Sequence, residues 1–218
     1  MNQLLINPRA LDDPQPPAEE AFDSLLEWIF DRGYDEKDVN FEGTALRAAK
    51  GFAQLVLPPA AIENEVAKMM QKRFPTRSDG MVLCKHNICF SLCPHHLLPV
   101  IYRVSVAYIP EEHVIGISKL SRLTWLLSRR PTLQEDLTAD LADVLYANDD
   151  RPKQYQGLKT KGSAVYVEGL HLCMAARGIE SAEARVSTQE LRGIFLTQPA
   201  TRQEFVDAVT RNAPALIP

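Results

Sequence analysis

The sequence has no long apolar run: no stretch of roughly 18 apolar residues occurs in it, so no segment reads as a membrane-spanning helix. Its first residues, MNQLLINPRALDDPQPPAEE, lack the basic start and the apolar core of about 7 to 15 residues that a secretory signal needs. An excess of basic charge is also missing, because 28 acidic and 24 basic residues give a net charge of −4. We therefore expect a cytoplasmic protein with no general affinity for nucleic acid or for an anionic membrane, in which any anion site is local.

Cysteine is scarce, and there is no internal repeat. The four cysteines are Cys84, Cys89 and Cys93, which fall within ten residues, and the distant Cys173. Because no secretion signal is present, a metal site or a catalytic thiol is a better interpretation of this cluster than two disulfides. The 218 residues, 45% of them apolar, suffice to bury the core of one domain, or of one domain with a helical annex.

Composition and hydrophobic spacing divide the chain into four segments. They are an extended N-terminal arm over 1–18, where four prolines occur, a helical region over 19–76, a main domain over 77–212 and a short tail over 213–218. Apolar residues at helical spacing predict the helices of the second segment, which start near residue 19, cover 44–57 and include residues 62–70.

The main domain is expected to combine strands and helices. From residue 82 the apolar period changes to two, which predicts a strand with one face made of Val82, Cys84, His86, Ile88 and Phe90. The further predicted elements are a strand over 100–109, helices over 118–130 and 132–147, an exposed loop over 148–162, strands over 163–174 and 191–196, and a helix over 201–212. This order favours an α+β fold with an antiparallel sheet.

The stretch SLCPHHLLPV places Cys93 and His96 at a spacing that one turn can close around a metal ion. The alternative is a buried thiol beside a hydrogen-bonded imidazole. A later HLC triplet weakens that alternative, because alternate residues of a strand share a face and His171 and Cys173 would then lie side by side. Zinc binds thiolates and imidazoles tetrahedrally, and a catalytic site keeps one of the four positions open for water. We expect such an open, three-ligand site.

A closed structural site with Cys89 as its fourth ligand is the competing interpretation. Along an extended strand Cys89 and Cys93 would be roughly 13 Å apart at about 3.3 Å per residue. Two sulfurs bound to one zinc ion cannot be more than about 4.6 Å apart. Only a sharp bend would allow the closed site, so Cys84 and Cys89 are expected in the core.

GISKLSR places Ser118, Lys119 and Arg122 at the start of a predicted helix, where free N–H groups and the helix dipole favour anions. The plainer interpretation is a serine N-cap followed by solvated basic residues.

TLQE has two interpretations as well. It matches a capping box in which Glu135 reaches back to the N–H of Thr132. Alternatively, Gln134 and Glu135 offer an amide and a carboxylate that match the hydrogen-bonding edge of guanine.

Six stretches taken together, CPHHLLP, VAYIP, VIGISKLSR, RPTLQEDLT, HLCMAARG and TRQEF, resemble the successive motifs of the GTP cyclohydrolase I family, in the family's order. The resemblance runs from about Thr44 to the C-terminal helix. It implies the tunnelling fold and a ring-shaped homodecamer with active sites at subunit interfaces. It also implies conversion of GTP to 7,8-dihydroneopterin triphosphate and formate, in pterin, folate or 7-deazaguanine synthesis.

The resemblance implies a role for each candidate residue. Cys93, His96 and Cys173 would bind zinc. His95 would line the pocket, and His171 would exchange protons with the purine ring while zinc lowers the pKa of the water that attacks C8. The residues implied to bind GTP are Gln134 and Glu135 for guanine, Ser118, Lys119, Arg122 and Arg177 for the triphosphate, and Arg47 from a neighbouring subunit.

Three departures from the family pattern stand out. Pro94 replaces a usual glutamate, the loop over 148–162 is longer than usual, and RVSTQELRG brings Glu190 and Arg192 to unfamiliar places. They suggest an altered substrate or a divergent lineage. Two other functions compete with the enzyme: a catalytically silent homologue that binds a purine nucleotide as an oligomeric regulatory protein, and a small zinc-stapled interaction module. His95 and His171 beside three ligands argue against the module, because a structural site needs neither.

Overall fold

The computed structural model describes residues 16–148, 154–155, 157–211, 213–214 and 216. Most of the expected arm, part of the expected loop and half of the tail lie outside these residues. The chain divides into two compact units, Met1–Leu57 and Pro58–Pro218. The four-segment division expected from the sequence, with its boundary at residue 76, stays a prediction.

The first unit is a pair of helices. They are α1 (Pro16–Phe30) and α2 (Thr44–Ala53), joined through a short 3-10 helix, η2 (Val39–Phe41). Phe22 packs edge-on against Phe52 and Phe30 against Phe41, with ring centroids 5.8 and 5.2 Å apart. Both helices were predicted, although α2 ends earlier than the predicted helix.

The second unit contains the remaining elements. They are α3 (Pro59–Gln71), β1 (Arg73–Pro75), β2 (Val82–Leu92), β3 (Pro99–Pro110), β4 (His113–Ile115), α4 (Ile117–Ser128), α5 (Gln134–Val144), β5 (Thr160–His171), α6 (Leu172–Ala175), β6 (Val186–Gly193), α7 (Ile194–Thr197) and α8 (Pro199–Thr210). β2, β3, β5 and β6 form one antiparallel sheet in that order, and β1 pairs with β4 in a second, small one. The α+β class and the antiparallel sheet are confirmed. Among the described residues, every helix is too short or too polar to cross a bilayer.

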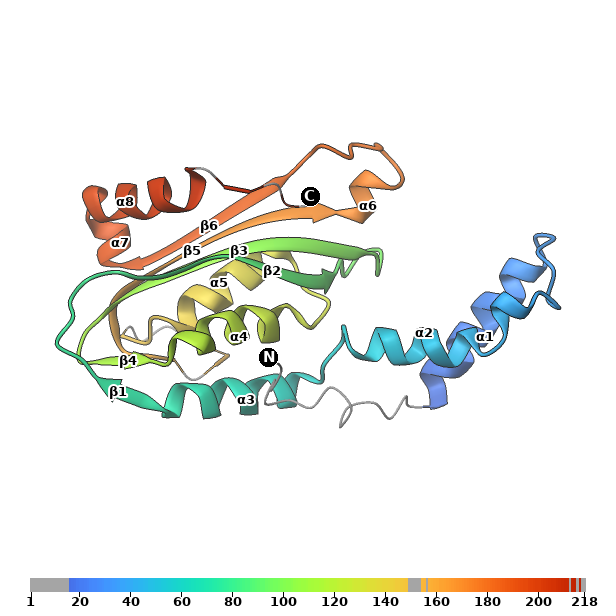
Figure 1. Cartoon of the computed structure of the whole chain (residues 1–218), viewed down its shortest axis with the longest axis horizontal. Helices are drawn as coiled ribbons and strands as arrows, with labels where there is room; N and C mark the ends of the chain where they lie inside the picture. The colour runs from blue at the N-terminus through green and yellow to red at the C-terminus, as the bar shows by residue number, and fades with distance from the viewer. Residues whose placement is uncertain (1–15, 149–153, 156, 212, 215, 217–218) are drawn as a thin grey trace. The chain divides into compact units, whose positions relative to one another are not determined.

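Helices cover both faces of the four-stranded sheet, with α4 and α5 on one side and α7 and α8 on the other (Figure 1). Alternate residues of β3, among them Val104 and Val106, are fully buried on the α4 and α5 side. The opposite face packs Ala107 and Ile109 against Phe205 of α8. Because both faces are covered, β3 is buried along nearly its whole length and forms the rigid centre of the sheet.

The prediction that the alternate residues of β2 from Val82 to Phe90 share one face is wrong beyond Cys84. The register of β2 against β3 shifts between Cys84 and Asn87, where His86 takes a left-handed conformation with φ 62°. Such a bulge inserts an extra residue and reverses the alternation that follows. Ile88 pairs with Arg103 and therefore lies on the face opposite to Cys84, where 46% of its surface is exposed.

The C-terminal strands also differ from the prediction. β5 ends at His171, and Cys173 lies in the single turn of α6, so these two residues do not share a strand face. β6 lies earlier in the chain than expected, and half of the predicted strand over 191–196 is the turn of α7. Apolar runs this short fit a strand and a buried helical turn equally well.

The unfamiliar Glu190 and Arg192 join β6 to α5. Arg192 is 9% exposed, and its Nε lies 2.8 Å from Oδ1 of Asp143 on α5, while Nη1 pairs with the Glu190 carboxylate. Two carboxylates thus balance a nearly buried guanidinium. This departure from the family pattern is therefore explained by ion pairs that join β6 to α5, and these pairs involve none of the predicted site residues.

Candidate active site

The three expected ligands converge at one end of the sheet. The ligand atoms of Cys93, His96 and Cys173 all lie within 4.8 Å of one another. Cys93 directly follows β2. Its N–H donates to the carbonyl of Leu98 at 2.9 Å, and this tight turn brings the imidazole of His96 back over the Cys93 thiol. Cys173 arrives from α6, next to the end of β5. The chain thus brings together residues 80 positions apart in sequence.

The geometry fits a metal ion. The Sγ of Cys93 lies 3.6 Å from Nδ1 of His96, and tetrahedral zinc with ordinary bond lengths holds a sulfur and a nitrogen at about that same separation, 3.6 Å. Cys93 is buried whereas His96 is exposed, which leaves one side of the group open. Burial raises the pKa of the Cys173 thiol, Cys93 adds to the increase, and the positive charge of Arg177 opposes it.

Cys89 does not join this group. It lies buried in β2 with its thiol between the hydroxyls of Thr124 and Ser128, and burial raises its pKa to about 11. A neutral, packed thiol is a poor ligand because metals bind the thiolate. The closed four-ligand interpretation is therefore wrong for the described residues, and Cys89 belongs to the core as expected.

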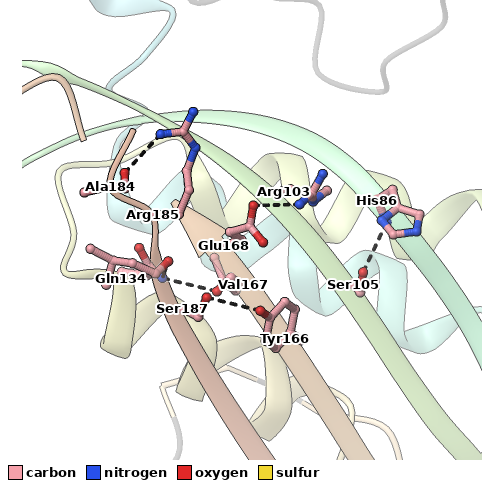
Figure 2. Close-up of polar contacts among 11 residues, drawn as sticks. His86, Arg103, Ser105, Gln134, Tyr166, Val167, Glu168, Ala184, Arg185 and Ser187 are labelled. Carbon is pink, nitrogen blue, oxygen red and sulfur yellow. Dashed lines mark hydrogen bonds and ion pairs between the residues drawn. The ribbon is translucent and has the colours of Figure 1, made fainter. Parts of the chain in front are cut away.

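His171 is held from behind by Gln134. Nε2 of His171 lies 2.9 Å from Oε1 of Gln134. The amide nitrogen of Gln134 donates to the carbonyl oxygen of Val167 at 3.3 Å (Figure 2). It also donates to the carbonyl oxygen of Val186 at 2.9 Å and to the hydroxyl of Thr188 at 3.1 Å. These acceptors fix Oε1 as the end that faces the imidazole, so Nε2 of His171 carries the hydrogen. The other ring nitrogen, Nδ1, is left for the site.

This arrangement changes what Gln134 can do. Its side chain is 2% exposed, and both ends of the amide already have partners in the protein. The direct contact with guanine implied by the resemblance stays a prediction, but it would require breaking these bonds. Burial lowers the pKa of His171, and the negative charge of Glu135 acts in the opposite direction.

Glu135 is exposed and does not form the capping box. α5 begins at Gln134 with Leu133 as its N-cap, and the N–H of Thr132 donates to the carbonyl of Leu92 at 3.4 Å. The donor that the capping box needs is therefore occupied, and that interpretation is wrong. The carboxylate lies close enough to His171 and Tyr102 for its charge to influence both.

Tyr102 is a site residue that the sequence reasoning missed. Its side chain is completely buried, yet its hydroxyl has no hydrogen-bond partner among the described residues. The ring packs edge-to-face on His171 with centroids 6.0 Å apart. Burial raises the pKa of Tyr102 well above its usual range, and the negative charges of Cys93, Glu135 and Cys173 raise it further. In sequence Tyr102 looks like any inward residue of β3.

The remaining predicted residues fall into two groups. His95, with Nδ1 4.0 Å from Sγ of Cys93, and Arg177 lie beside the metal group. Ser118, Lys119 and Arg122 lie on the first half of α4, which follows the opposite end of β3 (Figure 1). From Val100 to Ile109 β3 extends roughly 30 Å at about 3.4 Å per residue. Within one chain, Ser118, Lys119 and Arg122 are therefore far from the metal group, unlike Arg177.

The plainer interpretation of GISKLSR required a freely solvated Lys119, but this side chain is only partly exposed and is held by the protein. Its Nζ donates to the carbonyl oxygens of Met69 and Lys72, at 2.5 and 2.7 Å, at the C-terminal end of α3. The N-cap of α4 is Gly116, so Ser118 is not the N-cap. Arg47, in the first unit, folds onto its own helix start, with Nη2 2.9 Å from Oγ1 of Thr44.

A metal group with an open side, next to a half-buried histidine and an exposed carboxylate, defines a site for metal-assisted hydrolysis on an α+β scaffold. The family model for GTP cyclohydrolase I matches residues 18–210. The chain belongs to the GTP cyclohydrolase I family, and its function is that of a GTP cyclohydrolase I.

Curated relatives carry the same description. A GTP cyclohydrolase 1 of Wolinella succinogenes is 39% identical over 197 residues, covering 90% of this chain and 97% of its own. Relatives from Deinococcus radiodurans and Methylococcus capsulatus are both 34% identical, over 94% and 87% of this chain and 90% and 99% of their own. A solved structure of the archaeosine synthase QueF-Like in the apo form covers 54% of this chain and 97% of its own at 21% identity and a TM-score of 0.39, which is too low to add to the assignment.

Proposed function

We propose that the residues at the metal end of the sheet bind GTP and open its imidazole ring, so that C8 leaves as formate and the remaining atoms close to 7,8-dihydroneopterin triphosphate. The convergence of Cys93, His96 and Cys173 next to His171 supports this most strongly. The donor set suits zinc, which when bound would supply a Lewis acid that activates water at neutral pH. We place the enzyme in the cytoplasm, where GTP is available.

His171 moves the proton in this proposal. Its Nε2–H is held by Gln134, so the ring cannot turn freely and Nδ1 faces the site. A positioned imidazole can take a proton from one atom of the purine ring and return it to another as bonds break, which typically accelerates a reaction by about 10²- to 10⁴-fold. His95, exposed beside Cys93, lines the same opening.

Glu135 would recognise the base. Its carboxylate is free of protein hydrogen bonds among those described at the start of α5, and it lies on the same side of the sheet as His171. A carboxylate accepts the N1–H and N2–H of guanine together, an arrangement that adenine cannot offer. Arg177, near Cys173, is placed to meet an anionic part of the substrate.

The substrate site requires a second copy of the chain. Ser118, Lys119 and Arg122 are too far from Cys93 to hold the phosphates of a nucleotide whose base lies beside the same chain's His171. A neighbouring copy could supply them, and Arg47 as well. We therefore propose a homo-oligomer, with the decamer of the resemblance as its expected form, in which each active site combines residues of different chains.

The activity test is direct. Purified zinc-loaded protein is incubated with GTP, and formate and the fluorescence of the oxidised pterin are measured. Release of both in equal amounts is expected. Tight GTP binding without formate would instead support the catalytically silent homologue, and would refute the catalytic roles given to His171 and the metal group.

Shared sites are tested by mixing two inactive variants. Cys173→Ala removes a metal ligand, and Lys119→Gln removes a phosphate-binding charge while keeping an N–H donor for the end of α3. In co-assembled oligomers some sites combine the intact residue of each parent, so part of the activity returns. Mixtures as inactive as the parents would place both residues in the same chain's site, and would contradict the proposed interface.

A further inference from the structure

Tyr102 combines two properties that rarely occur together in a folded protein. It is fully buried, and its hydroxyl has no partner among the described residues. An unsatisfied buried hydroxyl destabilises a protein, and phenylalanine would fill the same space without that cost. A tyrosine at this position is therefore explained best by a partner that is not part of the protein.

The surroundings of the hydroxyl identify the partner as the substrate. The ring packs edge-to-face on His171, and Cys93, Glu135 and Cys173 lie close enough to raise the pKa of the Tyr102 hydroxyl. His171 belongs to the proton-transfer part of the proposed site. Cys93 and Cys173 belong to the metal-binding part, and Glu135 belongs to the part that recognises the base. The Tyr102 ring thus borders the place where the purine must bind if the proposed function is right.

Bound guanine needs a hydrogen-bond donor at one further atom. Glu135 accepts hydrogens from N1 and N2, but the neighbouring carbonyl oxygen at C6 needs a donor. Gln134 cannot supply it without losing its bonds to Val167, Val186 and Thr188, because its amide hydrogens are already used within the sheet. A phenolic O–H is a donor of the required kind, and the Tyr102 hydroxyl is unpartnered among the described residues while its ring packs on His171.

We propose that Tyr102 is a specificity-determining residue, whose hydroxyl donates a hydrogen bond to the C6 carbonyl oxygen of the bound guanine. The assignment rests on the proposed function, since it takes GTP as the ligand. Gln134 then acts behind the site as a positioning residue for His171, and Tyr102 and Glu135 together read the base.

Gly169 makes this placement possible. It pairs with Tyr102 across β3 and β5, and a Cβ added to it would lie 2.3 Å from Oε1 of Gln134 and 3.1 Å from the Tyr102 ring. Both distances are shorter than atoms tolerate without movement. The missing side chain at 169 therefore provides the space in which the tyrosine ring and the glutamine amide lie next to each other.

The test compares Tyr102→Phe with Tyr108→Phe. Tyr108 lies on the same face of β3 and is equally buried, but its hydroxyl accepts the N–H of Ile115 at 3.3 Å. GTP dissociation constants are measured on the zinc-loaded full-length protein by rapid mixing, before turnover intervenes. Removing a donor from a buried carbonyl should weaken GTP binding about tenfold in Tyr102→Phe, with the melting temperature unchanged or higher. Tyr108→Phe should lower the melting temperature and leave GTP affinity alone.

A second ligand identifies the atom. The triphosphate of 2-aminopurine riboside lacks the C6 oxygen, so Tyr102→Phe should change its affinity little although it weakens GTP. An equal loss for both nucleotides, or GTP affinity identical to that of the unmodified chain, would overturn the proposal. Failure of the proposed function would give a different result. The unmodified protein itself would then bind no GTP, or would bind GTP and release no formate.

Discussion

The two ends of the four-stranded sheet treat polar side chains in different ways. At the end where Val100 pairs with His171, the Tyr102 hydroxyl has no partner among the described residues. At the other end the buried hydroxyls donate to backbone carbonyls: Thr160 to Leu145 at 2.6 Å and Ser163 to Ala142 at 2.7 Å. One end leaves hydrogen-bonding capacity for a ligand, and the other uses it for folding. Substitutions of these buried hydroxyls at the two ends should therefore separate activity from stability.

The largest effect is expected at the metal group. Cys173→Ala removes one of three ligands, and the two that remain cannot hold the ion well, so both bound metal and GTP turnover should be lost. Metal per chain is measured by elemental analysis, next to formate release. Cys89→Ala is the control, since that thiol is buried outside the group and its loss should leave metal content unchanged. Stoichiometric metal in Cys173→Ala would remove the cysteine from the ligand set.

His171→Ala should separate chemistry from metal binding. Because the imidazole does not belong to the metal group, the ion should stay bound. Turnover should fall by about 10²- to 10⁴-fold, the usual contribution of a positioned acid or base. The rate of formate formation in a single turnover is measured together with the GTP dissociation constant, so that a slower chemical step is distinguished from weaker binding. A rate equal to that of the unmodified enzyme would assign proton transfer to another group, with His95 the nearest candidate.

Glu135→Gln should have an intermediate effect confined to the substrate. Glutamine replaces one acceptor with a donor that faces a donor of guanine, a mismatch of roughly 1–3 kcal/mol, so GTP turnover at low concentration should fall at least about tenfold. The melting temperature should not change, because Glu135 is exposed and caps nothing. Steady-state kinetics and thermal melting are measured together. Unaltered kinetics would leave guanine recognition without its main acceptor.

The smallest effect on activity is expected at the far end of the sheet. Ser163→Ala leaves the buried carbonyl of Ala142 without the hydroxyl that donates to it, so the free energy of unfolding should fall by about 1 kcal/mol. GTP turnover should remain normal, because this residue lies at the end of β5 away from His171. Chemical denaturation and initial rates provide the comparison. A large loss of turnover here would show that the two ends are not independent.

The sequence was sufficient for the parts of the site defined by local spacing. Cys93 and His96 lie in one turn, so their convergence follows from three residues of chain, and the order of motifs indicated Cys173. The side-chain partners of Gln134 could not be predicted, because they come from β5 and β6, and their positions depend on strand register. The distance of Lys119 from Cys93 likewise follows from the length and direction of β3.

The errors in secondary structure have a common physical origin. Periodicity averages over several residues, so it misses single-residue events such as the bulge at His86. It also cannot tell a strand from one helical turn, which is why Cys173 was placed on β5. The capping box at Glu135 failed for a third reason: the N–H of Thr132 was already bonded to Leu92, a tertiary contact that no local pattern contains.

The contact of Gly169 with Tyr102 and Gln134 has a consequence for how this chain could have evolved. A methyl group at 169 would collide with both side chains, so an ancestor with alanine there could not have accommodated them in their present positions. The loss of the side chain at 169 had to precede, or accompany, the arrival of the tyrosine. Among related chains, we therefore expect tyrosine at 102 only where 169 is glycine, and the two positions should have changed together along the lineage.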